Sequence, residues 1–288
     1  MTAQTIFQQP AIEHFVPVQV SPLVRRFTAG NGGVMTGPGT NSYLVGREQL
    51  ALIDPGPIDE QHIDAIVDTC GDRLRWILVT HTHRDHSPAA KIIAEKTGAE
   101  VYGNLLDDDG RQDETFDPLC GFAHNDVFTT DEFNLRVLAT PGHVDNHLCF
   151  LLEGENMLFT GDHIMQGSTV VIIPPAGDMK AYIDSLQMLM NYPIAALAPA
   201  HGQLMLNAEQ EIRKLIKHRL MREAKVVSAL QRLGSASIDE LTPLVYDDTL
   251  AELHPIARYS LWAHLLKLQK DGRASVADEL WQLRRAGA

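Results

Sequence analysis

The chain of 288 residues has few cysteines, few aromatic side chains and no long apolar run. The three cysteines (Cys70, Cys120 and Cys149) are widely spaced and form no C-x-x-C pair, which argues against a disulfide framework and a thiolate zinc site. No apolar run approaches the roughly 18 residues that a membrane helix needs. The first twenty residues lack a basic segment followed by an apolar one, so we expect no signal peptide and a cytoplasmic location.

Basic side chains are also scarce, with a formal net charge of −13 and a pI of about 5.4. This charge argues against strong non-specific binding to nucleic acids or membranes. Residues 1–208 carry 11 Lys+Arg against 26 Asp+Glu, whereas residues 209–288 carry 13 against 11. The asymmetry predicts two domains, 1–208 and 209–288.

Short apolar segments bounded by turn residues alternate with helical periodicity over the first 208 residues. Strands are expected within 42–46, 50–56, 75–80, 100–104, 135–143, 147–162 and 194–202, and helices within 59–71, 87–98 and 178–192. Ser87 is the expected cap of the second helix. Interleaved hairpins and helices predict an α+β class, with a mixed sheet sandwich covered by helices.

The last 80 residues have a different character. Helices are expected at 207–234, 237–246 and 255–272, followed by a small hairpin within 273–285. The second of these helices starts with a capping-box pattern, Ser237 and Glu240. Three helices and a hairpin predict a small winged-helix-like α domain.

The stretch "RWILVTHTHRDHSPAA" (75–90) places four ligating side chains directly after an apolar strand. A strand that ends at Thr80 points His81 and His83 the same way, because side chains alternate. Asp85 and His86 then lie on the turn before the next helix. Imidazole nitrogens and carboxylate oxygens suit zinc, and also iron or manganese.

Three more candidate ligands follow apolar runs and lie beside glycine turns: His143 in "TPGHVDNH", Asp162 in "LFTGDH" and His201 in "APAHG". Strand ends that meet at one edge of a sheet are a common way to build a site on a rigid scaffold. The whole set therefore indicates two metal ions rather than one.

This ordered set, with "GTNSYLVG" and "LIDPG" upstream, resembles the metallo-β-lactamase superfamily over about residues 18–205. The resemblance implies an αββα sandwich with the site at one edge. It implies that one metal takes His81, His83 and His143, that the other takes Asp85, His86 and His201, and that Asp162 bridges the two. Asp54, in "LIDPG", is expected to accept a hydrogen bond from a ligand histidine or only to cap its own turn.

Two divalent ions, zinc in the first place and iron or manganese as alternatives, would hold a shared water as a bridging hydroxide at neutral pH. The hydroxide would attack a carbonyl carbon or a phosphoryl phosphorus, and Asp85 would both ligate and orient it as the catalytic residue. Activity is expected to fall at acid pH, because imidazoles bind metals in the neutral form.

Other features are less specific. The acidic segment 105–117 is expected to be a solvated loop. The Gly-rich segment 29–41 lacks a terminal Gly-Lys-Ser/Thr and is expected to be a mobile loop near the site. The apolar segment 168–178 either lines a substrate pocket or forms a core strand. Arg84 and His163 are each either functional or ordinary structural residues.

Within the superfamily, the nearest resemblance is to the glyoxalase-II-like, β-lactamase-like hydrolases with a C-terminal winged helix. Asp162 argues against β-lactam hydrolysis, because true lactamases lack this residue. A Gly-Cys-Gly-Arg turn after Asp162 and a large insertion before His201 are both missing. Asn146 departs from relatives that often have an acidic residue there.

Three functions remain open. The first is hydrolysis of a small ester or thioester. The second is a metal-dependent single-stranded RNA endonuclease, for which Arg258, Tyr259, Trp262 and Lys267 form a faint basic and aromatic pattern that at helical spacing more often belongs to an ordinary helix with one buried face. The third is a DNA-binding regulator with a metal-sensing domain, which the near-neutral tail argues against. No membrane partner is expected, and the sequence indicates neither the oligomeric state nor the substrate-binding residues.

Overall fold

The structure, a computed structural model, describes residues 6–107 and 109–284. Contacts divide the chain into two compact units. The first unit contains the chain up to Thr140, Asn146–Thr169 and Tyr192–Glu209; the second contains Pro141–Asp145, Val170–Asn191 and the chain from Gln210 onward. Domains 1–208 and 209–288 stay a prediction, because these units are defined by contacts and not by independent folding.

The first unit is built on two mixed sheets. The six-stranded sheet has the order β1-β2-β3-β4-β5-β6, and the five-stranded sheet has the order β11-β10-β9-β8-β7. The first comprises β1 (Val18–Gln19), β2 (Val24–Thr28), β3 (Asn41–Val45), β4 (Leu50–Ile53), β5 (Leu74–Leu78) and β6 (Glu100–Tyr102). The second comprises β7 (Val127–Thr129), β8 (Asn134–Ala139), β9 (Leu148–Leu152), β10 (Met157–Gly161) and β11 (Ala196–Pro199). Most neighbours are antiparallel, but β4–β5, β5–β6 and β10–β11 are parallel.

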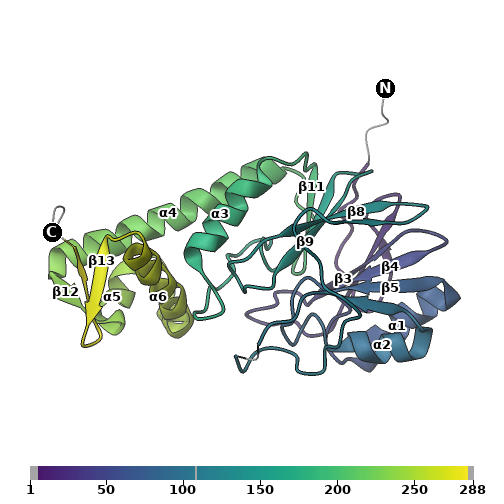
Figure 1. Cartoon of the computed structure of the whole chain (residues 1–288), viewed down its shortest axis with the longest axis horizontal. Coiled ribbons are helices and arrows are strands. Elements are labelled where there is room, and N and C mark those ends of the chain that lie inside the picture. Colours follow the sequence, from purple (N-terminus) through teal and green to yellow (C-terminus); the bar gives the residue numbers. More distant parts are fainter. Residues whose placement is uncertain (1–5, 108, 285–288) are drawn as a thin grey trace. The chain divides into compact units, whose positions relative to one another are not determined.

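The alternation of side chains along the strands creates two cores. Tyr43 and Ile53 of the first sheet pack with Phe150 and Phe159 of the second, which joins the two sheets face to face (Figure 1). On the first sheet, the side chains between these, such as that of Leu52, point to the opposite face and form the second core. Five of the strands (β3, β4, β9, β10 and β11) are buried along their whole length, so they are covered on both faces and their sequences are mostly apolar rather than alternating.

Two helices cover the outer face of the six-stranded sheet (Figure 1). Helix α1 (Glu60–Cys70) starts where the Asp59 side chain accepts hydrogen bonds from two backbone amides, and α2 (Ala89–Thr97) ends at the left-handed Gly98. The expectation that Ser87 caps α2 is wrong. The Ser87 hydroxyl donates instead to Asp113 Oδ2 at 2.7 Å, in a segment remote in sequence.

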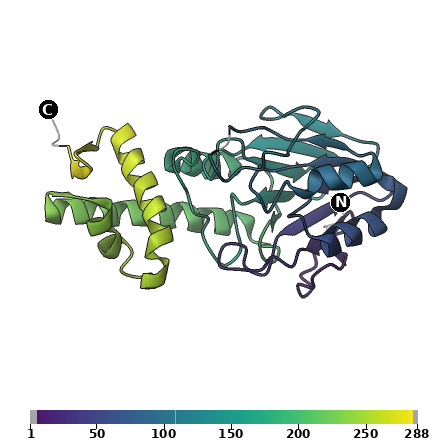
Figure 2. The same cartoon turned by 90° about the horizontal axis from the view of Figure 1, so that it is seen from below.

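The second unit contains α3 (Met179–Leu189), α4 (Ala208–Leu233) from Gln210 onward, α5 (Ile238–Val245), α6 (His254–Lys270) and a three-stranded sheet. The sheet pairs β12 (Ser235–Ala236) with β14 (Leu280–Leu283), and β14 with β13 (Ala274–Ala277). Figure 2 shows α6 crossing α4, where Lys267 and Glu223 form an ion pair of 2.8 Å. The predicted hairpin and the predicted capping box at Ser237 are both confirmed.

Helix α4 is the longest helix, yet it is rich in charged residues. Within the described residues, no helix combines the length and the hydropathy that crossing a bilayer would require.

Candidate metal centre

All seven candidate ligands lie just beyond the carboxyl ends of strands. Strand β5 leads to His81, His83, Asp85 and His86, β8 leads to His143, β10 leads directly to Asp162, and β11 leads to His201. Strand β4 likewise leads to Asp54. Rigid strands therefore deliver each of these side chains, and short irregular turns aim them.

The first group comprises His81, His83, His143 and Asp162, whose candidate ligand atoms all lie within 4.8 Å of one another. The Nε2 of His81 and the Nδ1 of His83 are 3.0 Å apart, so these nitrogens face one point. The Nδ1 of His143 lies 2.9 Å from the Val171 carbonyl oxygen, which leaves Nε2 as its candidate ligand atom.

The second group comprises Asp85, His86 and His201. The Nε2 of His201 lies 3.4 Å from Asp85 Oδ2, and the Nε2 of His86 lies 3.5 Å from the same oxygen. Asp162 Oδ1 lies 3.1 Å from His201 Nε2 and 3.5 Å from His86 Nε2. Asp162 therefore belongs to the first group and also borders the second, which is the position that a bridging carboxylate would occupy.

Asp54 contacts His86 directly and His81 through Thr80, on the side of these rings away from the candidate ligand atoms. Its Oδ2 lies 3.0 Å from His86 Nδ1, and it accepts a hydrogen bond from the Thr80 hydroxyl at 2.8 Å. The Thr80 oxygen is itself 3.0 Å from His81 Nδ1. A carboxylate in contact with the outer nitrogen of a candidate ligand orients the ring and selects its tautomer.

The electrostatics of the cluster differ between its two sides. Burial alone would raise the pKa of Asp85, but His86 and His201 hold this pKa at about 2. Burial alone would lower the pKa of His201, but Asp162 and Asp85 raise it to about 10. For His81, burial together with His86 and His83 places the pKa well below its usual value. The acidic side thus attracts positive charge, and His81 stays neutral, the form that binds cations.

One buried atom tests whether the cluster suits a cation. The Nε2 of His86 is buried and has no hydrogen-bond partner among the described residues, and the nearest carboxylate oxygens, on Asp85 and Asp162, are 3.5 Å away. Buried polar atoms are rarely left unpaired. A cation held by this nitrogen and the two carboxylates would satisfy all three, so the donor set fits a divalent metal.

The sequence patterns predict no role for two further residues at the site, His147 and Asn41. His147 is fully buried; its Nε2 accepts a hydrogen bond from the Asp162 backbone amide at 3.2 Å, and its ring centroid is 5.0 Å from that of His81. Asn41 donates to the carbonyl oxygens of Pro199 and Gly202, on either side of His201. The sequence signal for His147 is its place four residues after His143, directly before the buried strand β9.

The Gly-rich segment 29–41 does reach the site. Thr40 donates to Asp85 Oδ2 at 3.3 Å, and the Gly39 carbonyl oxygen lies 3.2 Å from His201 Nδ1. At the tip of the same segment, Val34 is 80% exposed and Met35 is 49% exposed. The segment therefore joins two candidate ligands at its base and presents apolar surface at its tip.

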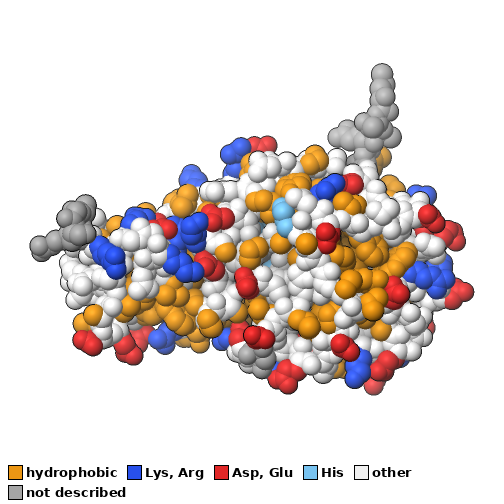
Figure 3. Space-filling view, in the orientation of Figure 1, with side chains coloured by type: hydrophobic (Ala, Val, Ile, Leu, Met, Phe, Trp, Pro, Cys, Tyr) orange, Lys and Arg blue, Asp and Glu red, His pale blue; other side chains and the backbone are white. Residues whose placement is uncertain are grey.

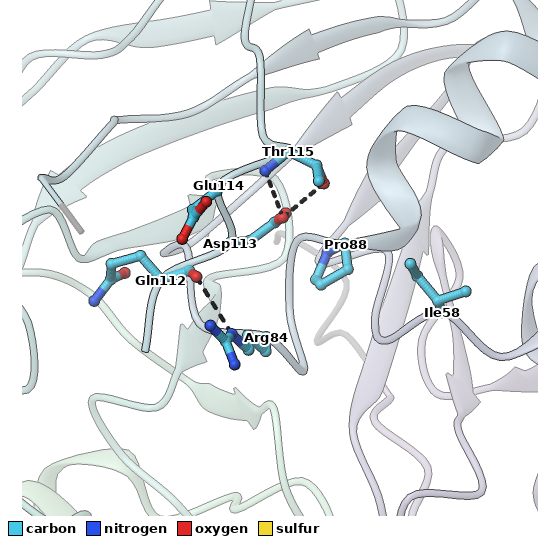
Figure 4. Close-up of a pocket in the computed structure, with 7 residues that line it drawn as sticks. All are labelled: Ile58, Arg84, Pro88, Gln112, Asp113, Glu114 and Thr115. Atoms are coloured by element: carbon cyan, nitrogen blue, oxygen red, sulfur yellow. Dashed lines mark hydrogen bonds between the residues drawn. The ribbon is translucent and has the colours of Figure 1, made fainter. Parts of the chain in front are cut away.

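The described residues of segment 105–117 form an irregular and largely exposed loop, as expected, but two of its side chains are anchored in the protein. Gln112 and Phe116 are buried, and the segment packs along the turn that carries His81 to His86. A pocket of about 440 Å³ lies at this junction, lined by Ile58, Arg84, Pro88, Gln112, Asp113, Glu114 and Thr115 (Figure 4). The Arg84 Nε donates a long hydrogen bond of 3.5 Å to the Gln112 carbonyl oxygen.

Two ambiguous features are also placed. Within segment 168–178, Val170 and Ile172 are buried and the segment forms no strand, while the Val171 carbonyl contacts His143. His163 is fully buried and its ring centroid lies 5.8 Å from that of His147. His163 is thus part of the packing behind the cluster.

The faint basic and aromatic pattern on α6 is largely used inside the second unit. Arg258 pairs with Asp239 at 3.1 Å, Lys267 pairs with Glu223 and Asp271, and Trp262 packs against the core. On the face shown in Figure 3, basic side chains of this unit are interspersed with acidic ones. These contacts leave little of the pattern for binding a nucleic acid strand.

Comparison with known proteins agrees with this arrangement. Residues 35–201 match the metallo-beta-lactamase superfamily, and residues 237–281 match the beta-lactamase associated winged helix domain. The chain therefore belongs to the metallo-β-lactamase superfamily. The predicted family is confirmed. The predicted fold class, an α+β metallo-β-lactamase sandwich with a C-terminal winged-helix-like domain, is confirmed as well. The prediction that the chain is a hydrolase of this superfamily is also confirmed.

Individual relatives are more distant. Lactamase-like protein nscB of Arthroderma benhamiae is 35% identical over 230 residues, which is 77% of this chain but 48% of the relative, so the chain spans about half of that protein. An atrochrysone carboxyl ACP thioesterase of Aspergillus chevalieri is 33% identical over 79% of this chain and 74% of its own length.

The fold is also found among solved structures. A metallo-beta-lactamase family protein of Thermus thermophilus has a TM-score of 0.75 at 20% identity and covers 91% of this chain and 99% of its own. The protein TTHA1623, solved in a di-iron-bound form, has a TM-score of 0.51 at 26% identity and covers 67% of this chain and 96% of its own. The first likeness concerns the fold alone.

Proposed function

We propose that this chain is a binuclear metal-dependent hydrolase of thioesters. The observation that carries the proposal is the meeting of seven side chains in two groups that share Asp162 at their border. Family membership supports hydrolysis, and the di-iron form of TTHA1623 supports a two-metal site. A hydrolase of oxygen esters is the closest variant of the same proposal.

His81, His83 and His143 would hold one cation, Asp85, His86 and His201 would hold the other, and Asp162 would touch both. When bound, divalent cations lower the pKa of water to about 7 and polarise a carbonyl oxygen. Imidazole and carboxylate donors fit zinc, and also iron or manganese.

Asp85 is the residue that we assign to the reacting water. Its side chain is 27% exposed, whereas that of Asp162 is 12% exposed and those of His86 and His201 are almost fully buried. Asp85 is therefore the acidic group that substrate and solvent reach most readily. Thr40 holds Oδ2 by donating to it, and the carboxylate is ionised well below neutral pH, so it can accept a hydrogen bond from water and orient it.

Two observations support a thioester as substrate. The relative from Aspergillus chevalieri is named an atrochrysone carboxyl ACP thioesterase. The segment that contacts Asp85 and His201 carries the exposed apolar Val34 and Met35 at its tip, and such a surface suits an acyl group.

A hydrolysis screen tests the proposal directly. The full chain is stripped with a chelator, reloaded with zinc or manganese, and offered acyl-N-acetylcysteamine thioesters, the matching oxygen esters and labelled single-stranded RNA. Thiol release is measured with a thiol-reactive dye. A blank of protein alone is subtracted, because the exposed Cys120 would also react with the dye. We expect thioester turnover that falls about 10²–10⁴-fold in Asp85→Ala. Asp64→Ala, a surface variant, is the matched control.

Metal-loaded protein that turns over none of the thioesters overturns the proposal. RNA cleavage that disappears in Asp85→Ala, with thioesters left intact, would establish the endonuclease instead. That alternative, and the DNA-binding regulator, gain no support from the contacts of Arg258 and Lys267. The cytoplasmic location stays a prediction.

Asp54→Asn should weaken cation binding without removing any proposed ligand. Three donors converge on Asp54: the Thr80 amide, the Thr80 hydroxyl and the His86 ring. An amide group cannot accept from all of them, so His86 loses its fixed orientation. We expect an affinity loss of about 10–100-fold, measured by competition with a chromogenic chelator. Unchanged affinity would show that Asp54 only caps its own turn.

A further inference from the structure

The buried Gln112 connects the segment 105–117 to the proposed metal centre. Its Oε1 accepts a hydrogen bond from the Thr82 hydroxyl at 2.7 Å, and its Nε2 donates to Asp109 Oδ1 at 3.1 Å. The Thr82 oxygen also accepts from Asn146 Nδ2 at 2.9 Å, and this amide donates further to the Asn104 carbonyl oxygen. Thr82, Gln112 and Asn146 are all less than 9% exposed.

Thr82 lies between two proposed ligands. His81 and His83 turn nitrogens toward each other at 3.0 Å, while the Thr82 hydroxyl bonds to residues on other segments. Fixing the position of Thr82 therefore also fixes the backbone that carries the His81 and His83 side chains. The network has four anchors in the chain, near residues 82, 104, 109–112 and 146.

The backbone is fixed at the same place. The Asp113 amide donates to the Thr82 carbonyl oxygen at 2.7 Å, and His83 forms an isolated bridge with Gln112. Further along, the Ser87 hydroxyl donates to Asp113 Oδ2, so residues 112–113 contact the turn that carries His81 to His86 at two points. Figure 4 shows the adjoining Arg84, Gln112 and Asp113. Buried amide and hydroxyl groups cost free energy unless paired, and their bonds are directional.

We propose that Thr82, Gln112 and Asn146 form a positioning network that sets the spacing of His81 and His83 and thereby the affinity of one of the two cation positions. This inference rests on the proposed function, because it takes His81 and His83 as cation ligands. It predicts that the two cation positions respond differently, since Asp85, His86 and His201 are braced by other partners, such as Asp54 and Gly39.

The test uses the full chain with three single variants. Thr82→Val keeps the shape but removes the hydroxyl, Thr82→Ser keeps the hydroxyl, and Thr242→Val removes the hydroxyl of another buried threonine, which donates to the Ile238 carbonyl oxygen in the second unit. Each protein is titrated with Co²⁺, whose visible absorption reports each cation separately, and kcat and KM for the thioester are measured on the same samples.

In Thr82→Val we expect one of the two cations to bind about 10–100-fold more weakly and the other to bind as in the wild type. Thr82→Ser should restore the affinity to within a few-fold, and Thr242→Val should bind both cations normally. Equal weakening of both cations, wild-type affinity in Thr82→Val, or a loss in Thr82→Ser as large as in Thr82→Val would each overturn the network.

Gln112→Leu gives an independent check, alone and combined with Thr82→Val. If both act through one network, the double variant loses about as much affinity as either single variant. Losses that multiply would show that the two residues act separately, against the proposal. If the variants lose cation affinity as expected but no protein hydrolyses the thioester, the network is supported and the proposed function is overturned. If the wild-type chain binds no cation, both are overturned.

Discussion

Asp162→Asn is expected to lower thioester hydrolysis by about 10³-fold or more and to reduce the bound metal below two ions per chain. Asp162 lies in the first group of candidate ligands, and its Oδ1 also borders His86 and His201. The substitution keeps the shape but removes the negative charge that both cations would share. Losing several kcal/mol of charge stabilisation corresponds to that factor in rate. Metal content by elemental analysis and initial rates on one preparation provide the measurement.

Asp178→Asn is the matched control for Asp162→Asn. Asp178 caps α3 and pairs with Lys270, so the same chemical change is made at a helix terminus rather than beside the cluster. We expect normal metal content and normal turnover in the control. Two ions per chain and wild-type rates in Asp162→Asn would contradict the shared role of this carboxylate.

Phe150→Ala is expected to lower the free energy of unfolding of the first unit by about 3–5 kcal/mol. Phe150 is fully buried at the centre of β9, pairs with Val137 and Phe159 on the neighbouring strands, and packs edge-to-face on Phe122. The deletion opens a cavity between the two sheets, where rigid strands relax little. Calorimetry in the presence of a chelator measures the effect without a contribution from metal binding.

Val127→Ala provides the comparison for the core, because Val127 is 40% exposed on the edge strand β7. A change of at most about 0.5 kcal/mol is expected there. A loss below about 1 kcal/mol in Phe150→Ala would mean that the two sheets are not held together by this core. In that case the strand ends that carry the candidate ligands would lack a rigid support.

Much of this architecture could be predicted from local patterns. Apolar runs with flanking turns located most strands of the two large sheets but not β1, β2 and β7, and Ser237 with Glu240 located the start of α5. The crowded stretch after β5 indicated a metal site because four ligating side chains follow one strand within six positions. These features are encoded by neighbours in the chain, where backbone geometry alone limits the possibilities.

The failures have a different cause. Ser87 looked like a helix cap, but its hydroxyl donates to Asp113, and nothing in the largely exposed segment 105–117 indicated that Gln112 is buried against Thr82. His147 showed no pattern, yet it accepts a hydrogen bond from the Asp162 amide. In each case the deciding partner lies 15 to 30 residues away, and the path of an irregular loop between them has no periodicity to read.

The sequence by itself determined which side chains could bind metal, in what order they occur and on which strand ends they stand, because residue type and strand periodicity are local properties. Only the tertiary structure decided that Asp162 borders both groups, that Asp54 braces His86, and that segment 105–117 closes over the ligand-bearing turn. Those relations depend on how sheets and loops pack, since a hydrogen bond is made or lost over a few tenths of an ångström.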